Sequence, residues 1–149
     1  MTSSNTGLAF ASGDYSSSHQ AALEQIDRKL LQVCKRCFIA TNAMDKENDL
    51  QALEKFERYR IELISYIDLV KTVLYDRLRL TIDPQQYLEL CSALEADSRK
   101  IYKRILVFSV HPGHVAVQRR KLFVRAMWRI DINLTNNHIR ERDILYSLL

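Results

Sequence analysis

Two cysteines and two histidines carry the spacing of zinc ligands. Cys34 and Cys37 have two residues between them, as do His111 and His114, and together they form the donor set of a Cys2His2 site. The histidines flank Pro112-Gly113, a turn signal that can present both rings. Both cysteines, however, fall within an expected helix, where a cysteine packs as a small apolar residue. We therefore predict packed thiols, two loop histidines, and no bound metal or other cofactor.

A basic segment is the second feature with chemical potential. Between Ser98 and Ile130 there are nine Lys or Arg residues and no Asp or Glu. Four lie within two turns of one expected helix, and others recur every four residues along the next, one turn from a tryptophan. Cations beside a stacking aromatic ring suit a phosphate backbone or an acidic protein surface. The predicted partner-binding residues are Arg99, Lys100, Lys103, Arg104, Arg119, Arg120, Lys121, Arg125, Trp128 and Arg129.

The charge distribution leaves three interpretations of this segment open. Residues 1–75 hold nine Lys or Arg and ten Asp or Glu, whereas residues 76–149 hold thirteen and eight. The basic second half can bind an acidic protein, bind nucleic acid, or pair internally with the first half. Internal pairing would use acidic residues of the second expected helix, namely Glu47, Asp49, Glu54, Glu57 and Glu62.

Signatures of common enzyme classes are missing from the sequence. The three glycines, at positions 7, 13 and 113, are too few and too scattered for a glycine-rich phosphate loop. No Gly-x-Ser-x-Gly elbow and no Glu-x-x-His pair occurs. A catalytic triad assembled only in space would leave no such signature. We predict that the protein is not an enzyme.

Long helices are expected to position these residues. No Gly or Pro occurs from Asp14 to Asp83, so nothing punctuates the chain there. The first helix should begin near Ser17, which forms a capping box with Gln20. Its apolar stripe follows a heptad spacing at Leu23, Ile26, Leu30, Val33, Cys37, Ala40 and Met44. Three further residues widen this face and favour a bundle over a two-stranded coiled coil: Leu31, Cys34 and Phe38.

The second expected helix runs from Asn48, a cap paired with Gln51, to about Leu80. Its stripe comprises Leu53, Phe56, Leu63, Ile67, Val70 and Leu74, and a third column adds Tyr59, Tyr66 and Val73. A short polar link at residues 45–48 predicts an antiparallel hairpin. Because its apolar columns are wider than a monomeric hairpin needs, we expect self-association or a stable heteromeric partner.

Capping signals define the rest of the chain. Asp83-Pro84 starts a third helix that ends before Pro112, with its inward face at Tyr87, Leu90, Cys91, Leu94, Ile101, Ile105 and Phe108. A short strand at residues 106–110 is the alternative for its last turns. A fourth helix is expected over residues 115–134, with five residues facing the core: Leu122, Phe123, Ala126, Met127 and Ile130. The polar run 135–137 predicts a break before a short helix over residues 138–147. His19 and His138 fall near expected helix starts, where we expect them to be solvated.

The predicted fold is all-α. It is an antiparallel up-and-down bundle of four main helices with a short C-terminal fifth helix, forming one domain over residues 19–149. Residues 1–18, rich in Ser, Thr and Asn, are expected to be a disordered tail. No basic residue precedes Arg28, no apolar run approaches the ~20 residues of a membrane span, and three cysteines is a low, odd number. An intracellular location, cytoplasmic or nuclear, is therefore expected.

The function predicted from these features is that of a non-catalytic protein–protein interaction module. It would be a subunit or adaptor of a helical assembly and would bind an acidic or apolar partner surface. The alternative is a nucleic-acid-binding or regulatory helical protein that uses the basic segment 99–129. The two differ in their dependence on salt, because phosphate binding weakens steeply as salt rises.

Overall fold

The computed structural model describes the backbone of residues 13–149 and the side chains of residues 18–149. Helix accounts for 92% of the described residues, and no strand occurs among them. The all-α prediction is confirmed, and the alternative of a strand at residues 106–110 is wrong because α5 (Ser92–Ser109) covers most of it. No helix in this part of the chain is long and apolar enough to cross a membrane.

The first half of the chain forms the predicted hairpin. It consists of α1 (Gly13–Lys46), α2 (Asp49–Val70), the π-helical segment η1 (Lys71–Tyr75) and α3 (Asp76–Thr81). Asn48 caps α2 as predicted, since its side-chain oxygen accepts a hydrogen bond from the Gln51 amide at 3.0 Å. Helix α1 starts at Gly13 rather than near Ser17. Residues 13–18, assigned above to the tail, are therefore helical, and the tail's residues 1–12 lie outside the described residues.

The third stretch begins at the predicted cap. Asp83 accepts hydrogen bonds from the Gln85 and Gln86 amides at 3.1 and 3.3 Å, and Pro84 takes the first position of α4 (Pro84–Leu90). Cys91 then interrupts the helix before α5. The buried face of α5 includes two polar side chains, Ser98 and Tyr102, that the apolar pattern did not reveal.

The last stretch corrects the prediction of a fifth helix. It consists of α6 (Gly113–Gln118), α7 (Arg120–Leu145) and the short 3-10 segment η2 (Tyr146–Leu148). The break expected at residues 135–137 does not occur, because the Asn137 amide is buried and donates to Ser98 and Tyr102 instead of turning the chain. The helix is interrupted at Arg119, whose backbone leaves the helical region at φ −122° and ψ 51°.

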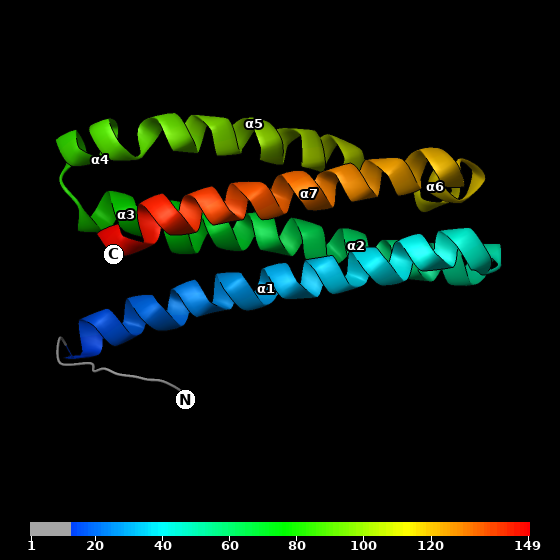
Figure 1. Cartoon of the computed structure of the whole chain (residues 1–149), viewed down its shortest axis with the longest axis horizontal. Helices are drawn as coiled ribbons and strands as arrows, with labels where there is room; N and C mark the ends of the chain where they lie inside the picture. Colours follow the sequence, from blue (N-terminus) through cyan, green and yellow to red (C-terminus); the bar gives the residue numbers. More distant parts are fainter. Residues whose placement is uncertain (1–12) are drawn as a thin grey trace.

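The helices lie side by side, and successive long helices run in opposite directions (Figure 1). Helix α7 packs against α1 and α5, and α2 packs against α1 and α5 on the far side of the view. Helix α6 packs on α2, where a Cβ on Gly113 would run into the Leu53 side chain. Glycine at this position lets α6 approach α2 without displacing the end of the Leu53 side chain.

The core contains most of the predicted stripes. From Ile26 to Met44, the heptad residues of α1 are buried, and Tyr59 and Tyr66 of the third column on α2 are fully enclosed within the chain. Two predicted inward residues, Leu90 and Leu122, are exposed, and so is Leu31 of the widened α1 face. Phe38 of the widened α1 face is 63% exposed. On α7, Phe123 and Met127 take the core positions, so the neighbouring Leu122 turns about 100° away from them.

The Asp83 cap provides a test of the local structure. Asp83→Ala should lower the free energy of unfolding by about 1 kcal/mol, because it leaves two amides at the start of α4 without an acceptor. Urea denaturation followed by far-UV circular dichroism measures the change. Asp68→Ala is the matched control, since it removes an exposed carboxylate from the last turn of α2, where it caps no helix start. An equal loss in both variants would contradict the capping role.

Candidate partner-binding surface

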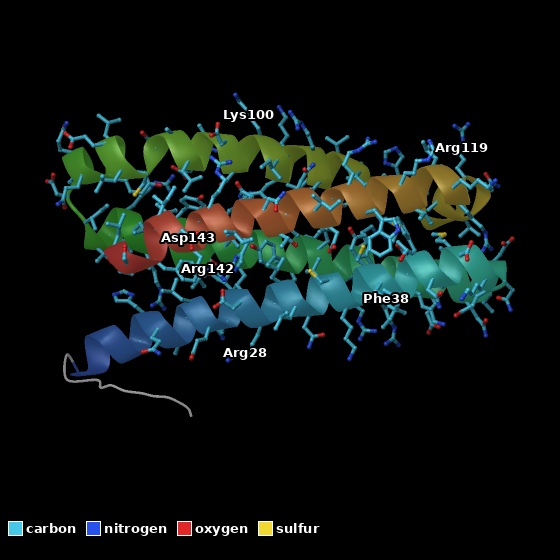
Figure 2. The ribbon with its side chains drawn as sticks, in the orientation of Figure 1. Arg28, Phe38, Lys100, Arg119, Arg142 and Asp143 are labelled. Carbon is cyan, nitrogen blue, oxygen red and sulfur yellow. The ribbon has the colours of Figure 1, made fainter. Side chains whose placement is uncertain are left out.

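The basic residues of α5 project from its outer face. Arg99, Lys100, Lys103 and Arg104 are all exposed, and Lys100 points away from the rest of the molecule in Figure 2. Arg99 forms an ion pair with Glu95 one turn before it, at 3.3 Å. The other three line a shallow cleft of about 390 Å³ together with the exposed Val107.

Arg120 is a predicted binding residue whose contacts instead join two elements of the described fold. Its guanidinium donates to the Met44 and Glu47 carbonyl oxygens at 2.9 and 2.8 Å and pairs with the Asp49 carboxylate. These bonds tie the start of α7 to the link between α1 and α2. The interpretation of internal pairing therefore holds for Arg120 and Asp49.

The acidic residues of α2 do not neutralise the rest of the basic segment. Glu62 pairs with Lys29, Glu57 with Arg60, Glu54 with Arg58, and Glu47, in the link before α2, with Lys55. Within the described residues, seven of the predicted binding residues have no carboxylate in ion-pair range: Lys100, Lys103, Arg104, Arg119, Lys121, Arg125 and Arg129. Their charge faces solvent.

The free cations of α7 divide between two grooves. Arg129 lies with Arg104 of α5 in a groove of about 360 Å³ between α5 and α7. Lys121 and Arg125 lie in a groove of about 440 Å³ between α1 and α7, called the α1/α7 groove below. The lining residues of the latter are Phe38, Thr41, Asn42, Met44, Asp45, Arg120, Lys121, Val124, Arg125 and Trp128. The even spacing of the cations along α7 therefore does not make a single stripe.

Two aromatic side chains are exposed to solvent in the α1/α7 groove. Phe38 is 63% exposed and Trp128 is 41% exposed, one from each wall. Trp128 is thus an exposed aromatic beside the cations, as the sequence suggested. Large apolar side chains beside unpaired cations give this groove both an apolar and an electrostatic means of holding a partner.

The potential zinc ligands do not come together. Cys34 lies 3.9 Å from the Thr135 hydroxyl and Cys37 3.6 Å from the Met127 carbonyl oxygen, both against α7. His111 packs against Phe108 and Phe123. No group of three or more His, Cys, Asp or Glu residues able to hold a metal occurs in the described part of the chain. Burial raises the pKa of the Cys34 thiol to about 11 and that of Cys37 to about 12, so both are protonated and poor nucleophiles near neutral pH.

A buried carboxylate cluster was missed by the sequence analysis. Glu141 of α7 is 1% exposed. It accepts hydrogen bonds from Tyr75 at 2.5 Å, from Tyr102 at 2.9 Å and from Ser98 at 3.0 Å. Burial raises the pKa of Glu141 above its ordinary value, and these three hydroxyls partly offset that rise. The cluster connects η1, α5 and α7, and we interpret it as a structural element.

His19 and His138 are buried, which corrects the prediction that they are solvated. His138 lies 2.9 Å from the Asp27 carboxylate and 3.2 Å from the Tyr66 hydroxyl, and Tyr146 donates to the same Asp27. His19 is buried near Arg77. The sequence signal near His138 was the polar run 135–137, which predicted a break between two helices but lies within α7, where Asn137 contacts other polar groups.

Comparisons with known proteins give no family assignment, because no family model, curated protein or solved structure matches this chain.

The raised pKa of Glu141 predicts a distinct pH dependence. The folded state holds this proton more tightly than the unfolded chain, so the stabilising contribution is greatest below about pH 4.5 and is lost as pH rises through the folded pKa. The stability of wild type minus that of Glu141→Gln should therefore fall as the pH rises above about 4.5. Urea denaturation at each pH measures the difference. The same slope for the exposed Glu24→Gln would contradict the assignment.

The Arg120 contacts predict unequal effects at neighbouring arginines. Arg120→Met keeps the apolar stem but removes four polar contacts, to Asp49 and to the carbonyl oxygens of Met44, Glu47 and Val117, so it should cost about 2 kcal/mol of stability. Arg119→Met changes an exposed residue and should stay within about 0.5 kcal/mol of wild type. Thermal and urea unfolding of both variants measure this. A cost at Arg119 as large as that at Arg120 would show that the guanidinium contacts add nothing.

Proposed function

We propose that this protein is a non-catalytic interaction module, a subunit or adaptor that binds an acidic protein partner through the surface around α7. The observation that carries this proposal is the set of seven solvent-facing cations that have no carboxylate in ion-pair range among the described residues, from Lys100 on α5 to Arg129 on α7. The proposal places such a module in an intracellular helical assembly.

Electrostatics and apolar contact would act together in this role. Unpaired cations on one face raise the encounter rate with an acidic surface. Solvated ion pairs alone add little affinity, and exposed large side chains such as Phe38 and Trp128 would supply the apolar burial. A surface with both charged and exposed apolar side chains would bind its partner specifically without catalysing a reaction.

The polar interior supports a role without catalysis. The Glu141 carboxylate is enclosed, and its hydrogen bonds go to three hydroxyls of the protein. The Cys34 and Cys37 thiols are held protonated. None of these groups offers an accessible, activated nucleophile or base of the kind that acid–base or nucleophilic catalysis uses.

Charge reversal on α7 tests the proposed function. Lys121→Glu with Arg125→Glu should sharply reduce the recovery of partner proteins crosslinked to the full-length chain in native extract, while helicity stays unchanged. The matched control, Arg28→Glu with Lys71→Glu, makes the same charge change at exposed residues outside the α1/α7 groove. Quantitative mass spectrometry compares the recovered proteins. Equal recovery with both double variants would refute the proposal.

Nucleic acid is the second candidate partner, favoured by the cations that continue onto the outer face of α5. If phosphate neutralisation dominates, the logarithm of affinity for a random RNA should fall linearly with the logarithm of salt, by about 0.7 for each contact. Fluorescence anisotropy from 50 to 200 mM salt would show this. If the protein binds RNA tightly with this salt dependence, and if Lys100→Glu with Lys103→Glu abolishes that binding, nucleic acid rather than an acidic protein is the partner.

A further inference from the structure

We propose that the α1/α7 groove is a docking site for an acidic amphipathic helix of a partner protein, a proposal that rests on and deepens the proposed function. The groove has a volume of about 440 Å³ and is walled by two antiparallel helices (Figure 1). Figure 2 places Phe38 on the α1 wall. A helix laid along it would make the fifth member of the bundle.

The apolar side chains along the groove match the repeat of a helix. Beyond the groove, α1 carries Leu31, which is 70% exposed and lies seven residues before Phe38. On α7, the exposed Ile132 lies one turn after Trp128. Two turns of helix span about 10.5 Å, the separation of apolar anchors at positions i and i+7 of a docked helix. Both walls thus offer apolar contacts at helical intervals.

The charges of the groove select an acidic occupant. Lys121 and Arg125 have no carboxylate in ion-pair range among the described residues, whereas Arg120 is held by Asp49 and two carbonyl oxygens. Asp45 is the one acidic side chain in the lining, near the end that Arg120 closes. Acidic residues flanking the apolar face of the incoming helix would meet Lys121 and Arg125.

The groove is built before any partner arrives. Its walls belong to helices α1 and α7, whose inner faces are buried at Cys37, Ala40 and Met127. Arg120 fixes one end by joining the start of α7 to the link after α1. A preorganised groove loses little conformational freedom when it binds, so most of the ordering cost would fall on the partner helix.

Trp128 provides a direct reporter, because it is the only tryptophan in the chain. The probe is a tryptophan-free synthetic peptide with leucines at positions i, i+4 and i+7 and glutamates flanking them. Titration into the full-length protein should shift Trp128 emission to shorter wavelength as the indole is covered. Circular dichroism should show that the peptide gains helix on binding. A scrambled peptide of the same composition is the control and should do neither.

Single and double variants distinguish the apolar contribution to peptide binding from the electrostatic one. Phe38→Ala should weaken the peptide about tenfold, and Lys121→Glu with Arg125→Glu should abolish binding at low salt. Leu122→Ala, an equally exposed apolar change outside the groove, should have no effect. A peptide with glutamines in place of the glutamates should bind about tenfold more weakly than the acidic one.

The remaining outcomes decide against the proposal. If no emission shift occurs, or if Phe38→Ala and Leu122→Ala behave alike, the groove is not a helix-docking site. The proposed function would still stand if charge reversal at Lys121 and Arg125 abolished recovery of the native partner. If the protein sediments as a dimer without peptide and Phe38→Ala makes it monomeric, the occupant is a second copy and the proposal is overturned.

Discussion

The Glu141 carboxylate sets the constraint on which the rest of the fold depends. Burying such a group without hydrogen bonds costs several kcal/mol or shifts its pKa until it is neutral. Tyr75, Ser98 and Tyr102 supply those bonds from η1 and α5, and moving α7 along its axis by a single turn would break them all. Apolar packing tolerates such slips, whereas this polar cluster fixes one arrangement of α7 against its neighbours.

The same constraint explains where sequence reasoning succeeded and where it failed. Apolar periodicity and capping residues act locally, so the α1 stripe, the Asn48 cap and the Asp83-Pro84 start could be predicted. Asn137 looked like part of a turn because Asn favours turns when it has no distant partner. Its amide instead binds Ser98 and Tyr102, about forty residues earlier in the chain. Such long-range pairing has no local signature.

The sequence was enough to predict most of the residues that are exposed on the proposed binding surface, but not how they are arranged in space. The sequence identified the cations and Trp128, and their exposure follows from the cost of burying an unpaired charge. It could not show that Arg120 joins the Met44 and Glu47 carbonyl oxygens. Nor could it show that Phe38 faces Trp128 from across a groove rather than widening the protein's own core. Spacing along one helix does not say which neighbouring helix lies beside each face.

Helix α7 therefore links the interior to the surface. Its C-terminal half carries Glu141, Asn137 and His138 in polar contacts with the other helices, while its N-terminal half presents Lys121, Arg125 and Trp128 to solvent. Trp128 and Glu141 lie thirteen residues apart on one continuous helix, about 20 Å along its axis. The Glu141 cluster fixes the position of α7 against η1 and α5, and the same continuous helix carries Trp128 beside α1. The polar contacts in the C-terminal half of α7 therefore position a helix whose N-terminal half forms one wall of the α1/α7 groove.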